Sequence, residues 1–146
     1  MMKIERFEDI KAWQESRVLV RMVYQTAKSD RGYSSDFKFR EQMQSAAVSI
    51  MSNIAEGFSR RSTKEFAQFL FVAKGSAAEV QSQLYVALDQ GYISQEKFGE
   101  LYSKSDEVAR LISGFIQYLL SKQRAPNKLN KLNNLAEGEG QGDVKA

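Results

Sequence analysis

The 146-residue chain contains no cysteine and no histidine. Disulfides, thiolate nucleophiles, cysteine–histidine zinc sites and imidazole acid–base catalysis are therefore excluded. No apolar run approaches the roughly 20 residues of a membrane span, and the first residues lack the apolar core of a signal peptide. We therefore expect a cytoplasmic protein.

Proline is almost as scarce, because Pro126 is the single one in the chain. Residues 1–125 are thus free of the strongest helix breaker, which favours an all-α fold. Hydrophobic residues at 42% and charged residues at 27% are ordinary for a globular domain of this length. The net charge of +3 permits nucleic-acid binding but does not require it.

Apolar residues recur at three- and four-residue steps in four long segments, the pattern of amphipathic helices. We expect helices over about residues 8–28, 36–59, 63–90 and 95–122. The apolar residues of the third follow heptad steps, which favours packing between long neighbouring helices. The expected inward residues are Trp13, Val20, Val23, Tyr24 and Ala27, then Phe39, Met43, Ala46, Ala47, Ile50 and Ile54, then Phe66, Leu70, Ala73, Ala77, Val80, Leu84 and Ala87, then Phe98, Leu101, Val108, Leu111, Ile112, Phe115 and Leu119.

Short polar connections separate these segments. Residues 29–35 form a loop that ends in a capping serine, and Gly57 with the basic residues after it marks the end of the second helix. Ser62 and Glu65 have the spacing of a capping box, and Gly91 ends the third helix.

Such short connections make consecutive helices antiparallel, so the predicted fold is an up-down-up-down four-helix bundle. The bundle should occupy residues 1–122. Residues 123–146 are rich in asparagine and glycine and predict a flexible polar tail.

The chain offers little for a catalytic or metal centre. Di-iron bundles need inward carboxylates with Glu-x-x-His pairs, and the carboxylates Glu41, Glu56, Glu65 and Glu79 have no histidine beside them. Structural roles are favoured for them. We predict no enzyme activity, no metal and no cofactor.

Small residues mark an expected close contact between the second and third helices. Gly75 lies in mid-helix, where glycine costs about 1 kcal/mol relative to alanine. The facing residues of the second helix are also small, so we expect Gly75 to let the two backbones approach there; they are Ser45, Ala46, Ala47 and Ser49.

Basic residues form two groups that are candidates for phosphate contact. At 100° per residue Arg6, Arg17, Arg21 and Lys28 fall within about 60° of one another on the first helix. Arg31 follows this stripe. The second group is Arg60, Arg61 and Lys64 at the second hairpin. The alternative, a solvated face with local ion pairs, stays open.

Val18 and Met22 lie nearly opposite the expected inward stripe of the first helix. An exposed apolar pair at this spacing predicts self-association through the first helix.

Three segments resemble one known family: residues 7–14 (FEDIKAWQ), 49–57 (SIMSNIAEG) and 65–76 (EFAQFLFVAKGS). They are similar to the bacterial four-helix-bundle family encoded by intervening sequences within 23S rRNA genes. The accessory variability protein of diversity-generating retroelements looks like the same fold. The similarity covers about residues 5–120, and Asn53, Glu56, Gly57 and Gly75 match as structural positions.

The resemblance implies a homo-oligomer, a pentameric ring with a basic surface. In the retroelement relatives it implies binding of nucleic acid and of a reverse transcriptase. Two hypotheses follow for this chain: a non-catalytic oligomer that binds structured RNA or DNA, or a protein–protein adaptor without nucleic-acid contact.

Overall fold

The structure is a computed structural model that describes residues 3–136, with side chains described over residues 3–123. Every regular element in this part of the chain is helical, as the composition predicts. No helix in it is both long and apolar enough to cross a membrane. The elements are the 3-10 helix η1 (Phe7–Asp9) and the α-helices α1 (Lys11–Lys28), α2 (Arg31–Ser35), α3 (Phe37–Phe58), α4 (Thr63–Asp89) and α5 (Gln95–Ala136).

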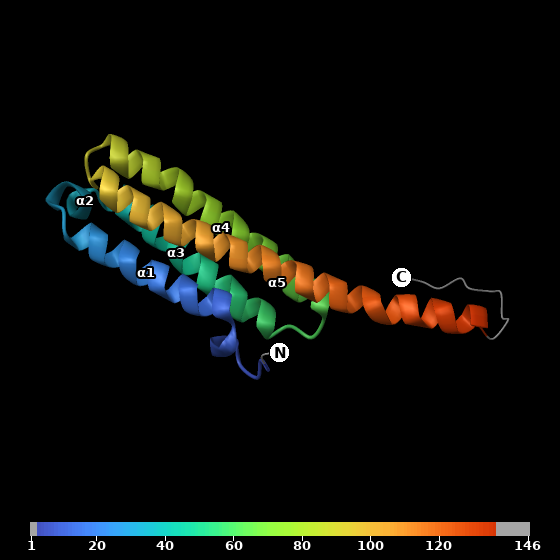
Figure 1. Cartoon of the computed structure of the whole chain (residues 1–146). Helices are drawn as coiled ribbons and strands as arrows, with labels where there is room; N and C mark the ends of the chain where they lie inside the picture. The colour runs from blue at the N-terminus through green and yellow to red at the C-terminus, as the bar shows by residue number, and fades with distance from the viewer. Residues whose placement is uncertain (1–2, 137–146) are drawn as a thin grey trace.

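Four long helices, α1, α3, α4 and α5, lie side by side (Figure 1). Both α1 and α4 pack against α3 and α5, so α1 and α4 are diagonally opposed. Tyr33 of α2 stacks on Tyr92 from the connection between α4 and α5, with ring centroids 5.5 Å apart. At the other end Phe66 of α4 contacts the rings of Phe58 and Phe115. The first and third connections therefore share one end of the molecule, and the α3–α4 connection lies at the other.

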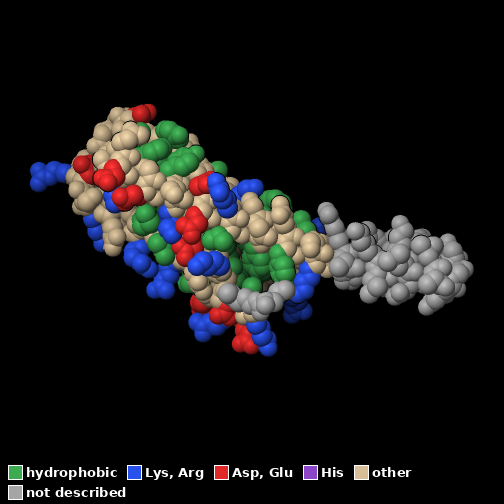
Figure 2. Space-filling view, in the orientation of Figure 1, with side chains coloured by type: hydrophobic (Ala, Val, Ile, Leu, Met, Phe, Trp, Pro, Cys, Tyr) green, Lys and Arg blue, Asp and Glu red, His purple; other side chains and the backbone are tan. Residues whose placement is uncertain are grey.

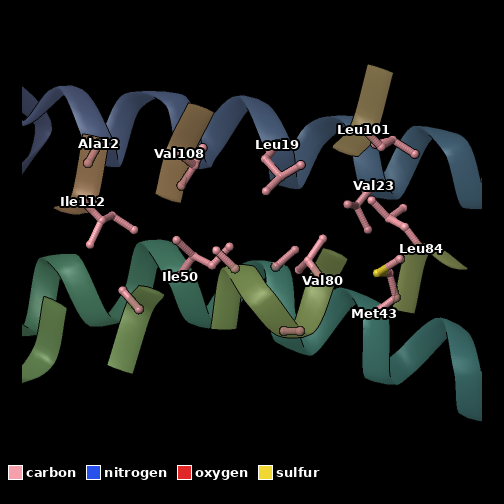
Figure 3. Close-up of a cluster of buried hydrophobic side chains, with 14 of the residues drawn as sticks. Ala12, Leu19, Val23, Met43, Ile50, Val80, Leu84, Leu101, Val108 and Ile112 are labelled. Atoms are coloured by element: carbon pink, nitrogen blue, oxygen red, sulfur yellow. The ribbon is translucent and has the colours of Figure 1, made fainter. Parts of the chain in front are cut away.

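The core runs along the axis between the four helices (Figure 3). The predicted inward residues of α3 are all buried, and those of α4 are buried except for Phe66, which is half-buried and packs against the core. The spacing of the apolar residues thus locates these two faces correctly, because each helix buries one continuous stripe.

The buried face of α1 is rotated from the predicted one. The prediction is confirmed for Val23 and Ala27, which are buried, while Trp13 and Val20 pack partly buried against the core. Leu19 is fully buried, whereas Tyr24 is 38% exposed. Ser16 and Thr26 are also buried, and their hydroxyls donate to the carbonyls of residues 12 and 22 at 2.6 and 2.7 Å. A hydroxyl bonded to its own helix can enter a core, and hydrophobicity alone does not reveal this.

Aspartates rather than a serine cap α2 and α3, the two helices that directly follow α1. Asp30 accepts from the Tyr33 N–H, so the predicted loop contains the short helix α2. Asp36 caps α3 by accepting from the Phe39 N–H at 3.2 Å. Both are ordinary N-cap residues, and the expected cap at Ser35 is wrong.

The ends of α4 agree with the prediction. The Ser62 hydroxyl accepts from the Glu65 N–H at 3.1 Å, which is the first half of the expected capping box. Gly91 has φ of +76°, a conformation that favours glycine. The Tyr92 N–H donates to the Ala87 carbonyl at 2.8 Å, as in a Schellman motif.

Two predicted boundaries are wrong. The first helix begins at Lys11 because Ile10 is extended, which leaves Arg6 outside the helix, and α5 does not end at Lys122 but continues to Ala136. Leucines at three-residue steps continue the apolar pattern past the proline, although four of the ten residues from 127 to 136 are asparagines. Of the predicted tail, residues 137–146 lie outside the described part.

The close approach between α3 and α4 occurs at Gly57, not at Gly75. A Cβ on Gly57 would lie 2.8 Å from Phe66 Cδ1 and 2.8 Å from Phe69 Cβ. Gly75 is exposed and a Cβ there would meet nothing within 4 Å. The small residues that do meet are Ser49 and Ser76, whose hydroxyls are 2.9 Å apart.

The Tyr92 hydroxyl donates to the Asp36 carboxylate at 2.6 Å and links the α4–α5 connection to the start of α3. This bond, with the Phe39 N–H, lowers the pKa of Asp36, and the same bond raises the pKa of Tyr92. Because the pKa of Asp36 is lowered in the folded protein, its ionised carboxylate stabilises the fold above about pH 4. This stabilisation is lost as the pH falls through the pKa that Asp36 has in the folded protein. Because the pKa of Tyr92 is raised in the folded protein, its protonated phenol stabilises the fold below about pH 10. This stabilisation is lost as the pH rises through the pKa that Tyr92 has in the folded protein.

We therefore expect Tyr92→Phe to be less stable than the wild type between about pH 4 and 10, with the difference shrinking on both sides. Urea midpoints measured for both proteins across this range test it. A difference that stays constant with pH would contradict the role of the bond.

Candidate nucleic-acid interface

The outward face of α1 carries a row of cations, Arg17, Arg21 and Lys28. At 100° per residue they fall within about 40° of one another, opposite the buried stripe of the helix. All three are exposed, and none forms an ion pair with any other residue whose side chain the structure describes. Figure 2 shows Lys and Arg side chains along the edge where α1 lies in Figure 1. We call these three residues the α1 basic row.

Arg31 extends this row at the first residue of α2. It is exposed and has no carboxylate partner among the described side chains. Asp30, which precedes it, is occupied in capping α2. The predicted stripe therefore continues past the end of α1, although Arg6 is separated from it and pairs with Glu8 at 3.2 Å.

Tyr24, which is expected to face inward, lies on this exposed face instead. It lies three residues after Arg21 and four before Lys28, the spacing of neighbours on a helix surface. It also lines a groove between α1 and α3 together with Glu41, Gln44 and Val48 of α3. This spacing from the basic residues is the feature of the sequence that indicates an outward Tyr24. An exposed ring among cations is the combination that binds unpaired bases.

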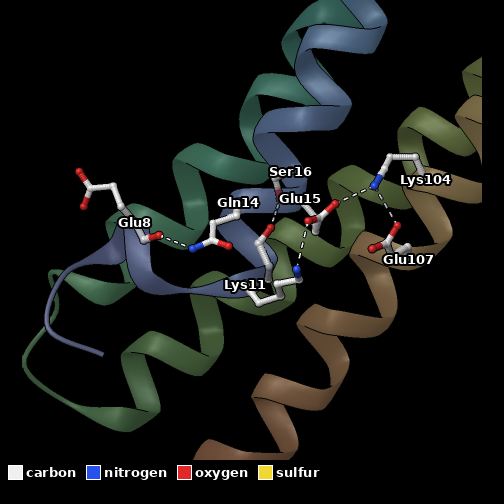
Figure 4. A network of polar contacts seen from close by, with 8 residues as sticks. Glu8, Lys11, Gln14, Glu15, Ser16, Lys104 and Glu107 are labelled. Carbon is white, nitrogen blue, oxygen red and sulfur yellow. Dashed lines mark hydrogen bonds and ion pairs between the residues drawn. The ribbon is translucent and has the colours of Figure 1, made fainter. Parts of the chain in front are cut away.

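Other basic residues nearby are neutralised by carboxylates (Figure 4). Lys104 of α5 contacts Glu15 of α1 at 2.6 Å and Glu107 at 3.0 Å, and Lys11 contacts Glu15 at 3.4 Å. The bond from Lys104 lowers the pKa of Glu15, and the bonds to Glu15 and Glu107 raise the pKa of Lys104. This network joins α1 to α5 and leaves little positive charge for an external ligand.

The second predicted group surrounds the α3–α4 connection. Arg60 pairs with Glu56 at 2.8 Å, and its guanidinium lies 4.8 Å from the centre of the Phe69 ring. Arg61 and Lys64 are exposed and form no ion pair among the described side chains. Arg60 is thus paired with Glu56 and packed on Phe69, whereas Arg61 and Lys64 have no carboxylate partner among the described side chains.

The structure does not bring the two groups together. The α1 basic row faces away from the core on α1, whereas Lys64 is on α4, the diagonally opposed helix. Arg31 and Arg60 lie at opposite ends of the molecule, beside the first connection and the α3–α4 connection. The seven predicted residues therefore form two surfaces.

The predicted contact through Val18 and Met22 is not an exposed apolar face. Both residues are half-buried, and Met22 packs against the core. The buried stripe of α1 is centred on Leu19, so this pair lies beside it rather than opposite. Large exposed hydrophobic side chains occur instead on α4, including Phe71 and Tyr85.

Among the described residues, no group of three or more aspartates and glutamates is arranged to hold a metal ion. An open groove of about 600 Å³ runs between α3 and α4. Lys38, Glu41 and Glu79 line it together with serines, glutamines and one alanine. These side chains have the character of a solvated surface groove.

The model of the 23S rRNA-intervening sequence protein family matches residues 8–114. The chain belongs to this family. The matched part spans α1, α3, α4 and α5 as far as Gly114, and so includes both basic groups. This match does not show the relation to the accessory variability protein of diversity-generating retroelements that the resemblance implies.

A solved structure agrees with the fold of this 23S rRNA-intervening sequence protein. It is a protein of unknown function from the S23 ribosomal protein family of Bacteroides thetaiotaomicron VPI-5482. The two share 22% identity with a TM-score of 0.67, over 72% of this chain and 97% of that chain. No curated protein matches the chain.

Proposed function

We propose that this member of the 23S rRNA-intervening sequence family is a non-catalytic, homo-oligomeric bundle of up-down-up-down topology that binds structured RNA or DNA in the cytoplasm. It would need no cofactor. The observation that carries the proposal is the α1 basic row, three exposed cations on one face without a neutralising carboxylate among the described residues. Phosphate oxygens are the natural partners of such a row.

Spacing supports contact with a nucleic-acid backbone. Arg17 and Arg21 are one helical turn apart, about 6 Å, and Lys28 lies about 10 Å further along the axis. Tyr24 between them supplies a ring on which an unpaired base can stack. This arrangement suits a folded RNA with both paired and unpaired nucleotides.

Self-association would strengthen the contact. One chain carries a net charge of +3, and the five copies that the resemblance implies would carry about +15. Several copies of the row would then engage one nucleic acid together, and linked sites bind more tightly than single ones.

The experiment is a fluorescence titration of a labelled 23S rRNA fragment at several salt concentrations. Three phosphate contacts per chain predict that log K falls with log salt with a slope of about −2 to −3 for each bound chain. Absence of binding at low salt, or affinity that does not change with salt, would contradict the proposal.

The exposed hydrophobic residues of α4 favour a second candidate, a protein adaptor that serves as an accessory subunit of a reverse transcriptase. Purified reverse transcriptase should then bind the chain after nuclease treatment. Loss of the complex on nuclease treatment would favour the nucleic-acid function.

A further inference from the structure

At the end of the bundle that holds the α3–α4 connection, α5 continues past the other long helices (Figure 1). Helix α3 ends at Phe58 and α4 begins at Thr63, so the apolar stripe of α5 runs on beyond the helices that cover it elsewhere. Figure 2 shows hydrophobic side chains gathered on the surface near the point where α5 leaves the bundle. The end of this stripe forms one wall of a groove, which we call the α5 groove.

The first hollow of the α5 groove has a volume of about 460 Å³ and draws its walls from four separate parts of the chain. Its apolar residues are Ile4 from the N-terminal segment, Phe58 of α3, Phe66 of α4, and Phe115, Tyr118 and Leu119 of α5. The Phe66 ring contacts those of Phe58 and Phe115 edge-on, with centroids 6.1 and 5.3 Å apart, so packing fixes this wall. A preformed apolar hollow of this size is typical of small-molecule sites.

Two lysines complete the lining of the first hollow, and no carboxylate of a described residue lines it. Lys122 of α5 is exposed, and its Nζ lies 5.6 Å from the centre of the Tyr118 ring. It forms no ion pair with a described side chain, and Lys3 has only an exposed partner, Glu5, at 3.6 Å. Exposed pairs of this kind contribute little. The first hollow thus joins an apolar floor to a positive rim, and a ligand with an apolar body and one negative head matches both.

The α5 groove continues towards the start of α1. A second hollow of about 340 Å³ shares Ile4 and Phe115 with the first, so the two lie side by side. Ile10, Leu111 and Gly114 are among its other lining residues. A Cβ on Gly114 would meet nothing within 4 Å, so this glycine leaves open space in the second hollow. The two hollows together offer an elongated apolar surface along α5.

The two ends of the α5 groove differ in charge. Asp9 lines the second hollow, and both cations on its rim already pair with carboxylates. Lys11 contacts Glu15 at 3.4 Å, and Arg110 contacts Asp106 at 2.9 Å. A negative head is therefore attracted to the rim of the first hollow, and the apolar body extends from there into the second.

The length of the α5 groove sets the length of the ligand. From Lys122 to Phe115 the first hollow spans about 10 Å of α5, and from Lys122 to Leu111 both hollows span about 16 Å. With C–C bonds of about 1.5 Å at about 111°, an extended alkyl chain advances about 1.3 Å per carbon. The first hollow therefore holds about eight carbons, and the two hollows together hold about twelve.

We propose that the α5 groove binds a fatty acid of about twelve carbons. Its carboxylate lies between Lys3 and Lys122, and its alkyl chain runs over Phe66 and Phe115 towards Gly114. The proposal depends neither on nucleic-acid binding nor on self-association.

The end of the chain itself matches the groove less well than a fatty acid does. Residues 137–146 contain the three acidic residues Glu137, Glu139 and Asp143, but their only apolar side chains are those of Val144 and Ala146. Such a segment could meet the positive rim but could not fill the aromatic floor.

Isothermal titration calorimetry of the full chain with sodium dodecanoate, below the concentration at which it forms micelles, tests the proposal. One dodecanoate should bind per chain. From octanoate to dodecanoate the affinity should rise by up to about fourfold for each CH₂, because each added CH₂ leaves water for the groove. The rise should level off beyond about twelve carbons, where the groove ends. Dodecanol and dodecyltrimethylammonium, which have the same chain without a negative head, should bind more weakly than dodecanoate.

Two substitutions locate the ligand. Gly114→Leu fills the second hollow, so it should reduce dodecanoate affinity to about that of octanoate and leave octanoate binding unchanged. Gly99→Leu is the matched control, because Gly99 is also an exposed glycine of α5 where a Cβ would meet nothing within 4 Å. Lys122→Gln should weaken binding of both carboxylates by up to about fivefold. Lys74→Gln, at an exposed lysine of α4, is its control for net charge.

Several results would overturn the proposal. These are no heat of binding with dodecanoate, equal binding of dodecyltrimethylammonium, or an equal effect of Gly114→Leu and Gly99→Leu. Binding that appears only in the triple variant Glu137→Gln/Glu139→Gln/Asp143→Asn would show that the end of the chain occupies the groove, and would overturn an external ligand. Binding of the rRNA fragment is measured separately and is not decided by any of these results.

Discussion

Gly57→Ala is expected to lower the free energy of unfolding by about 2 kcal/mol, although alanine is the better helix former. The new Cβ would lie 2.8 Å from Phe66 Cδ1, 2.8 Å from Phe69 Cβ and 3.2 Å from the Phe66 carbonyl oxygen. Phe69 Cβ and the Phe66 carbonyl oxygen are fixed to the backbone of α4. The contact is therefore relieved only if α3 and α4 separate. Separation would loosen the α3–α4 contact and the ring contact between Phe58 and Phe66.

Gly75→Ala is the matched control for this substitution. It makes the same chemical change in the neighbouring helix, at a position where the new Cβ meets nothing within 4 Å. Helix propensity should then stabilise the monomeric bundle by up to about 1 kcal/mol. Thermal unfolding followed by circular dichroism, at a concentration where the chain is monomeric, measures both. Equal melting temperatures for the two variants would contradict the assignment of the close approach to Gly57.

The double substitution Arg17→Glu/Arg21→Glu should weaken binding of the rRNA fragment about 100-fold at 0.1 M salt. Each reversal removes a phosphate contact and adds a repelling carboxylate, and a loss of more than 1 kcal/mol per position gives this factor. The slope of log K against log salt should fall by about 2 in magnitude for each bound chain. Both side chains are exposed and make no ion pair among the described residues, so stability should change little.

Lys97→Glu/Arg110→Glu on α5 is the charge-matched control. It also changes the net charge from +3 to about −1, but these cations already pair with Glu100 at 2.8 Å and Asp106 at 2.9 Å. Equal loss of affinity in both variants would mean that only total charge matters and would contradict a local α1 site.

The second basic group is tested with Arg60→Glu/Arg61→Glu. The two groups lie on different surfaces, so this variant and the α1 variant should not have the same effect. If only the hairpin variant loses affinity, the interface lies at the α3–α4 connection instead of on α1.

Local patterns in the sequence predicted most of the fold. The ends of α3 and α4 fall within one residue of the expected positions, since caps and heptad steps depend only on nearby residues. The face of α1 was misplaced because Ser16 and Thr26 are buried with hydroxyls bonded to their own helix. Tyr24 was assigned inward for its hydrophobicity, yet its spacing from Arg21 placed it among the cations.

The sequence by itself determined that this is an all-helical protein with four long amphipathic segments, without cysteine or histidine chemistry, and with two clusters of basic residues. Only the tertiary structure decided which glycine meets a neighbouring helix, which cations pair with a carboxylate and which hydrophobic side chains stay exposed. Gly57 and Gly75 look alike in sequence, and so do Arg21 and Lys104. Helical phase and capping arise within a few residues of chain, whereas a Cβ contact or an ion pair depends on helices brought together from distant positions.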